Sequence, residues 1–168
     1  MHKLYICLAI ILLLNACDKQ QSPHNTSDSG PFQAAEKLPQ PKPSGKLANG
    51  TFCFKKSLNQ DVTNVQIIIS GDDVSGFMNW IPYQKDSARG TLKGTQNQTG
   101  ELDLMYDYMI EGNQQSETKI MKIENDQLWV KKGELTDSKN DGHLVYKDVN
   151  QAKYNEHLEK ADCKALTE

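Results

Sequence analysis

Three carboxylates, Glu101, Asp103 and Asp107, are separated by even numbers of residues in the stretch 101–109. Paired carboxylates carry out general acid–base chemistry when burial raises the pKa of one of them, so that it holds a proton near neutral pH. Alternating charge on one face of a half-exposed β-strand produces the same spacing with no chemistry at all. The alternation favours the strand interpretation, and a catalytic role would require one of these side chains to be buried.

The segment 137–148 spaces its side chains as a calcium-binding EF-hand loop does. Asp137, Asp141 and Asp148 stand at loop positions 1, 5 and 12, and Gly142 stands at position 6. Lys139, however, places an ammonium group at position 3, where calcium needs an oxygen ligand, and position 12 is normally glutamate. We therefore expect an Asp-Gly turn of a β-hairpin here.

The other reactive side chains show no catalytic or metal-binding spacing. His24, His143 and His157 do not form a zinc motif. Ser75 lacks the first glycine of a nucleophile elbow, and no glycine leads into the Gly-Lys-Ser/Thr sequence of a phosphate loop. The sequence predicts no metal site and no cofactor, and it gives no support for an enzyme.

The N-terminus has the features of an export signal. His2 and Lys3 precede an apolar run at residues 4–14, whose 11 residues suit the core of a signal peptide. A membrane-spanning helix needs about 20 residues, and no second apolar run follows Asp18 to stop transfer. We expect this segment to direct export of the chain.

The sequence Leu14-Asn15-Ala16-Cys17 resembles the lipobox of bacterial lipoproteins, in which a small residue precedes the cysteine. The resemblance implies that the thiol of Cys17 is diacylated, that residues 1–16 are removed as a lipoprotein signal peptide, and that Cys17 becomes the mature N-terminus. Each buried acyl methylene contributes about 0.8 kcal/mol, so two or more chains anchor a protein stably. We expect a cell-envelope protein on the inner or outer membrane, with its domain facing the periplasm or the exterior.

Residues 17–46 differ in composition from the rest, being rich in Gln, Ser and Pro. Such a stretch buries too little apolar surface to offset the entropy of ordering, so we expect a disordered tether. Residues 47–168 are expected to form one β-rich domain.

The mature chain has a small negative net charge. Lys3 is the only charged residue among the first 16, so removal of the signal peptide leaves 18 Lys and Arg against 22 Asp and Glu. The lysines are scattered, and this excludes an obvious nucleic-acid surface.

Two cysteines remain for the domain once Cys7 leaves with the signal peptide and Cys17 carries lipid. In an exported protein, two such cysteines are expected to pair. Cys53 and Cys163 lie near the two ends of the domain, so the disulfide would tie the first strand to the C-terminal end.

Apolar and polar residues alternate along most of the domain, and turn-forming residues recur about every 8–12 positions. The pattern predicts a mainly β fold, an antiparallel up-and-down meander of about eight strands that closes into a small barrel or sandwich. Only residues 150–161 show partial helical spacing, so a short C-terminal helix is expected there. The expected strands cover residues 51–55, 65–70, 74–80, 90–95, 101–109, 118–124, 127–132 and 143–149.

A second resemblance supports this fold class. The succession Val74-Ser75-Gly76-Phe77-Met78-Asn79-Trp80, then Gly90-Thr91-Leu92-Lys93-Gly94, then Tyr106-Asp107-Tyr108-Met109 is similar to small uncharacterised bacterial lipoproteins with a β-rich domain. These have no assigned activity, so the resemblance implies the fold and the lipid anchor alone.

The alternating apolar residues that are predicted to face the interior of the β fold, which we call the inward stripes, leave two functions open. If the interior is filled, the domain is a non-enzymatic accessory module that binds an envelope protein or has a structural role, and this is our first expectation. If the interior is hollow, the domain is a lipocalin-like carrier of a small apolar ligand. The aromatic residues Trp80, Tyr83, Tyr106 and Tyr108 would then line the cavity. The inward stripes comprise Ile67, Ile69, Met78, Trp80, Leu104, Tyr106 and Tyr108.

Overall fold

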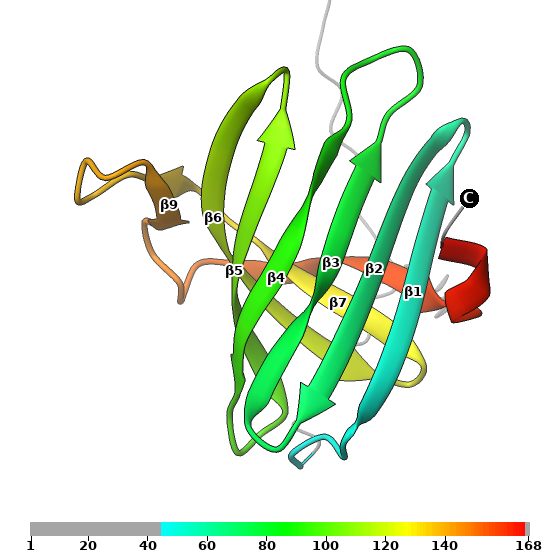
Figure 1. Cartoon of the computed structure of the whole chain (residues 1–168). Helices are drawn as coiled ribbons and strands as arrows, with labels where there is room; N and C mark the ends of the chain where they lie inside the picture. Colours follow the sequence, from blue (N-terminus) through cyan, green and yellow to red (C-terminus); the bar gives the residue numbers. More distant parts are fainter. Residues whose placement is uncertain (1–44, 167–168) are drawn as a thin grey trace, which may run out of the picture. The chain divides into compact units, whose positions relative to one another are not determined.

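The computed structural model describes residues 45–166. Eight of the strands in this part of the chain form a closed antiparallel barrel (Figure 1). Strands β1 to β7 follow one another around the barrel, and β10 lies between β7 and β1 and closes it. The predicted fold class is confirmed, with a barrel rather than a sandwich. The barrel strands are β1 (Gly50–Leu58), β2 (Asp61–Ser70), β3 (Asp73–Ile81), β4 (Ala88–Gln96), β5 (Glu101–Ile110), β6 (Asn113–Glu124), β7 (Gln127–Lys132) and β10 (Lys153–Lys160).

One end of the barrel is closed by its own core. This closed end carries the β2–β3, β4–β5 and β6–β7 turns, and the other, the open end, carries the β1–β2, β3–β4 and β5–β6 turns. Successive residues of a strand point to opposite faces, so every second side chain enters the interior. The core residues include Phe54, Val65, Ile67, Ile69, Val74, Leu92, Leu102, Leu104, Met121, Leu128, Val130 and Leu158, all almost fully buried.

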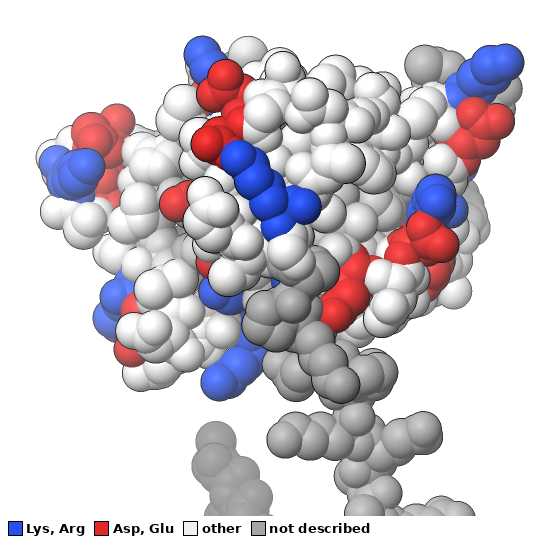
Figure 2. Space-filling model, turned by 90° about the horizontal axis from the view of Figure 1, so that it is seen from below, with Lys and Arg blue, Asp and Glu red and all other residues white. Residues whose placement is uncertain are grey.

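The chain enters the barrel at the closed end, where Leu47 packs against the core. Gln96, which is buried, holds it there: the Gln96 side chain accepts a hydrogen bond from Leu47 N at 2.8 Å and donates to Leu47 O at 3.1 Å. The same amide donates to Gly71 O at 2.6 Å. On this face, acidic and basic side chains stand beside one another instead of separating by charge, and Lys46 pairs with Asp72 (Figure 2).

Three inward-facing glycines let the sheet bend tightly at β3 and β4. A Cβ atom at Gly90 would collide with the carbonyl oxygen of Asp107, and one at Gly94 would collide with that of Asp103. A Cβ atom at Gly76 on β3 would likewise collide with the carbonyl oxygen of Gln66. Glycine at inward positions allows the close backbone approach that a small barrel requires.

The prediction of a C-terminal helix over residues 150–161 is wrong, because this segment contains β10. Glu156 and Leu158 face inward opposite Val130 and Leu128, whereas Tyr154 pairs with Lys131 on the outer face. A bulge between Tyr154 and Glu156 shifts the register, so the period of two is broken in the sequence. The pairing that closes the barrel overrides the weak helical spacing.

A small hairpin, β8 (Leu135–Thr136) and β9 (His143–Tyr146), leaves the barrel between β7 and β10. The predicted strand at residues 143–149 therefore exists in its first half, but it does not belong to the barrel. β9 pairs in parallel with β6 at Ser116 and Glu117. The imidazole of His143 contacts Ser116 Oγ at 2.7 Å and Thr118 Oγ1 at 3.1 Å, which fixes the hairpin to β6.

The predicted disulfide between Cys53 and Cys163 is present. It joins β1 to a short 3-10 turn, η1 (Cys163–Leu166), and Leu166 is buried. Next to it, Ala161 N donates to Cys53 O at 2.8 Å. In the described part of the chain, no helix has the length and apolar character needed to cross a bilayer.

Candidate ligand-binding cavity

A cavity of about 260 Å³ occupies the open end of the barrel. It exists because strands that touch at the closed end diverge toward the open end. β6 pairs with β7 only from Met121 onward, and β1 pairs with β10 only at Phe54 and Lys55. Across the cavity, β4 contributes the small side chain of Ala88, which leaves additional space.

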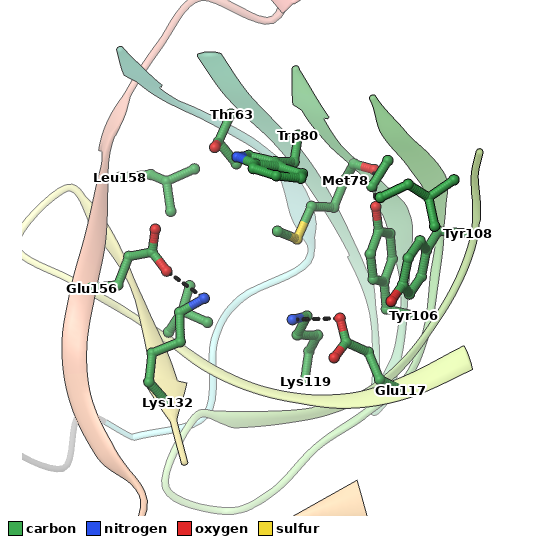
Figure 3. A pocket seen from close by; sticks show the side chains of 13 residues that line it. Thr63, Met78, Trp80, Tyr106, Tyr108, Glu117, Lys119, Lys132, Glu156 and Leu158 are labelled. Atoms are coloured by element: carbon green, nitrogen blue, oxygen red, sulfur yellow. Dashed lines mark hydrogen bonds and ion pairs between the residues drawn. The ribbon is translucent and has the colours of Figure 1, made fainter. Parts of the chain in front are cut away.

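One side of the cavity, the aromatic wall, consists of Met78, Trp80, Tyr106 and Tyr108 on β3 and β5 (Figure 3). The rings of Tyr106 and Tyr108 stack with their centroids 4.5 Å apart. Tyr106 is buried and donates from its hydroxyl to Met78 O at 2.9 Å, and Tyr108 donates to Gln115 Oε1 at 2.8 Å. Burial, with smaller contributions from Tyr108 and Glu117, raises the pKa of Tyr106, so its phenol remains a neutral donor.

The opposite side, the charged wall, consists of Glu117 and Lys119 on β6, Lys132 on β7 and Glu156 on β10. Lys119 Nζ lies 2.7 Å from Glu117 Oε1, and Lys132 Nζ lies 2.6 Å from Glu156 Oε2. Lys56 on β1 also reaches Glu156, at 3.1 Å from Oε1. Figure 3 shows the two ion pairs of the wall converging on the cavity from separate strands.

The environment of Glu156 keeps it ionised. Burial by itself would raise the pKa of this carboxyl, but the hydrogen bonds and positive charges of Lys132 and Lys56 together lower it. The ion pair of Glu117 and Lys119 is more enclosed, since their side chains are 12% and 11% exposed. Enclosed ion pairs lose hydration and stabilise a fold weakly at best, so a reason other than stability is expected for charge inside a barrel.

The predicted inward stripes divide between the core and the cavity. Ile67, Ile69 and Leu104 belong to the packed core, so the interior near the closed end is filled. Met78, Trp80, Tyr106 and Tyr108 line the cavity as expected for a hollow interior. Tyr83 does neither, because it is exposed in the β3–β4 loop and does not line the cavity.

The charged wall was not predicted. Glu117 and Lys119 are two residues apart and continue into buried Met121 at the same period, which is the one sign in the sequence that they face inward. The period of two does not identify Glu156 as an inward residue. The bulge between Tyr154 and Glu156 puts these two residues on opposite faces of β10 although they are two positions apart.

The carboxylates at 101–109 lie on the outer face of β5, as the strand interpretation predicts. Glu101 accepts a hydrogen bond from Tyr154 OH at 2.6 Å and pairs with Lys131 at 3.0 Å. Burial alone would raise the pKa of Glu101, but the bonds from Tyr154 and Lys131 and the charges of Lys131 and Lys122 lower it. The pKa of Glu101 is therefore lowered and not raised, which is the opposite of the shift that acid–base chemistry near neutral pH requires.

The first six residues of the segment resembling a calcium loop, 137–142, form the turn between β8 and β9, in agreement with the hairpin prediction. Asp137 uses its carboxylate oxygens to accept hydrogen bonds from Asp141 N at 3.1 Å and Gly142 N at 2.9 Å. Among residues 45–166, no three His, Cys, Asp or Glu side chains are grouped so that they could hold a metal ion. Cys17 and the lipobox lie outside the described residues.

No protein-family model matches the chain, and comparisons with curated proteins and with solved structures found no match. The cavity and its two walls therefore carry the functional argument.

Proposed function

We propose that this protein is a lipid-anchored envelope protein whose barrel binds a small amphipathic molecule in the cavity at its open end. The observation that carries the proposal is the contrast between the two walls. Met78 and Trp80 offer apolar and aromatic surface, and Lys119 and Lys132 offer hydrogen-bond donors on the other side of the same space. Ligand sites in proteins combine mostly apolar linings with a few placed polar groups in this way.

The volume limits the size of the ligand. Binding sites for drug-sized molecules usually measure about 300–1,000 Å³, so a cavity of about 260 Å³ suits a smaller molecule. Trp80 at the mouth is 39% exposed, which leaves the cavity accessible from solvent at the open end. A short acyl chain or one aromatic ring with a polar group fits this description.

The proposed anchor would attach the domain by its closed end. Leu47 enters the barrel there, and the cavity opens at the other end. A lipid on Cys17 followed by the tether at residues 17–46 would leave the mouth accessible to molecules in the aqueous compartment. Replacing Cys17 with Ser should move the protein from the membrane to the soluble fraction, and unchanged membrane association with unchanged mass would contradict the anchor.

Filling the cavity tests the binding function directly. Ala88 lines the cavity and is buried, so Ala88→Phe should occupy the space without removing a polar group. Ala48→Phe is the matched control, because Ala48 is exposed near the closed end. We expect the wild type and Ala48→Phe to bind anilinonaphthalene sulfonate, whose phenyl ring alone matches the cavity in size, with enhanced dye fluorescence, and Ala88→Phe to lose most of this signal while remaining folded by circular dichroism. Equal dye binding by folded wild type and Ala88→Phe would refute the cavity as the binding site.

A second candidate function is binding of an envelope protein, and it is supported by exposed side chains around the mouth of the cavity. Leu58 and Tyr83 are 61% and 51% exposed, and Tyr83 N donates to Asp61 Oδ1 at 2.7 Å, which holds the β3–β4 loop beside the β1–β2 turn. Exposed apolar side chains gathered at one end are a feature of interaction sites. Crosslinking in intact cells from a photoreactive residue at position 58, with one at position 93 as control, would test for a partner at this end.

A further inference from the structure

The charges around the cavity do not balance. Lys119 is neutralised by Glu117, but Glu156 serves two lysines, Lys132 and Lys56. The five side chains therefore contain one more cation than anion. Lys56 and Lys132 are 37% and 44% exposed, so water partly hydrates the excess cation, and an anionic ligand in the cavity would pair with it in place of that water.

The two lysines of the charged wall can both donate hydrogen bonds to a ligand in the cavity. Their ammonium groups point into the cavity from β6 and β7, with Glu117 and Glu156 bonded beside them (Figure 3). An ammonium group has three N–H donors, and one ion pair uses one of them. Both carboxylates, in contrast, are already paired with lysines, so a cationic ligand would add a positive charge to a cluster that already has one in excess.

The aromatic wall determines which chemistry suits the part of the ligand that does not contact the lysines. Met78, Trp80 and Leu158 present apolar surface, and the hydroxyl of Tyr106 is occupied by Met78 O. A ligand body against this wall can therefore bury apolar surface without leaving that hydroxyl unpaired.

We propose that the ligand of this cavity is an amphiphile with a single carboxylate, which lies between Lys119 and Lys132 while the apolar body lies against the aromatic wall. This inference rests on the binding function proposed above and adds the charge of the ligand to it. A single negative charge matches the excess of one cation.

Three probes of equal chain length separate charge from apolar burial: octanoate, octanol and octylammonium. Titration calorimetry with the Cys17→Ser full chain near neutral pH measures their affinities, and a shift of Trp80 fluorescence emission in a Trp129→Phe background reports occupancy of the cavity. Trp80 and Trp129 are the only tryptophans in the sequence, so this background isolates the cavity signal. We expect octanoate to bind at least about tenfold more tightly than octanol, as for a charge-assisted hydrogen bond, and octylammonium to bind most weakly.

Variants assign the effect to the charged wall. Lys132→Gln should reduce the affinity for octanoate to that for octanol, and Lys93→Gln on the outer face of β4 should change neither affinity. Lys132 is chosen over Lys119 because Glu156 keeps Lys56 as a partner, whereas Glu117 would lose the lysine shown bonded to it. If Lys132→Gln does not fold, Lys56→Gln removes the excess cation without changing the cavity lining and should also weaken octanoate selectively.

The possible results distinguish the two proposals. Equal affinities for octanoate and octanol in the wild type would overturn the carboxylate inference and leave cavity binding intact. Tighter binding of octylammonium would also overturn it, since the site would then prefer cations. Failure of all three probes to shift the emission of Trp80 or to give a heat of binding, together with failure of dye binding, would overturn the binding function and the inference with it.

Discussion

Loss of the disulfide should open the barrel at one junction, which we call the seam: the pairing of β1 with β10. Backbone pairing there is limited to Phe54 with Lys160 and Lys55 with Glu159. The bond from Ala161 N to Cys53 O, the ion pair of Lys56 with Glu156 and the disulfide complete the connection. Each other junction between consecutive barrel strands has a longer ladder, so the seam depends most on its covalent link.

The magnitude follows from the loop that the disulfide closes. Cys53 and Cys163 are separated by 110 positions, and the loop-entropy model gives about 4.7 kcal/mol for a closed loop of about 100 residues. Native domains are stable by only about 5–15 kcal/mol, so the double variant Cys53→Ala/Cys163→Ala should lose a large part of its free energy of unfolding. For a domain of this size the loss corresponds to a fall in Tm of about 15 °C.

The assay compares thermal unfolding of the wild type and the double variant with and without a reducing agent. The reductant should lower the Tm of the wild type and leave that of the variant unchanged. Hydrogen exchange should accelerate first at the seam, including the amide of Ala161, and last at the ladder between β3 and β4. A fall in Tm below about 3 °C, or uniform acceleration of exchange around the barrel, would refute the view that the covalent link holds the seam.

Three further predictions concern single side chains. The pKa of Glu156 is lowered in the folded state, so the ionised side chain stabilises the fold above the unfolded pKa of 4.5, and this stabilisation is lost as pH falls through the folded pKa. Glu156→Gln should therefore reduce the loss of free energy of unfolding at acidic pH, measured by urea titrations at a series of pH values. An unchanged loss at acidic pH would contradict this role of Glu156. Gly90→Ala should destabilise the fold by about 2 kcal/mol or more, because its Cβ meets Asp107 O, whereas Gly45→Ala, in open space, should be near neutral in the same denaturation assay. Tyr106→Phe should cost about 1 kcal/mol through the lost bond to Met78 O, and no loss would show that this bond contributes nothing net.

The strands were predictable wherever one face of the strand is buried and the register is regular. The expected range 127–132 coincides with β7 (Gln127–Lys132), and Leu102, Leu104 and Tyr106 on β5 face inward as their spacing indicates. The signal there is the period of two, which a half-buried strand imposes on its sequence.

The prediction failed at β10, where a bulge changes the face of the strand after Tyr154. A single inserted residue converts the period of two into a spacing that looks partly helical, and no local feature marks the insertion. The partners that determine the strand, β7 and β1, are distant in sequence, so the information that closes the barrel is not local.

The charged wall of the cavity escaped prediction for a different reason. Charged residues that alternate along a strand usually lie on the solvent face, and Glu117 and Lys119 have that appearance. They face inward because they are in phase with buried Met121, and the interior has room for them because β6 pairs with β7 only from Met121 onward. Sequence pattern identifies the face of a residue, but the width of a barrel at that level is a property of all the strands together.

The seam also constrains the order of events when the chain folds. β1 is the first barrel strand to be synthesised and β10 the last, so their pairing must wait until the C-terminal segment has emerged. Until then, β1 and β7 are exposed edges of an open seven-stranded sheet, and such edges are able to pair with other chains. Because contacts between distant segments form slowly, closure of the seam should be a late step in folding. An oxidant that captures Cys53 before Cys163 arrives would trap the open sheet, so the timing of thiol oxidation would decide how much of the newly made protein reaches the closed barrel.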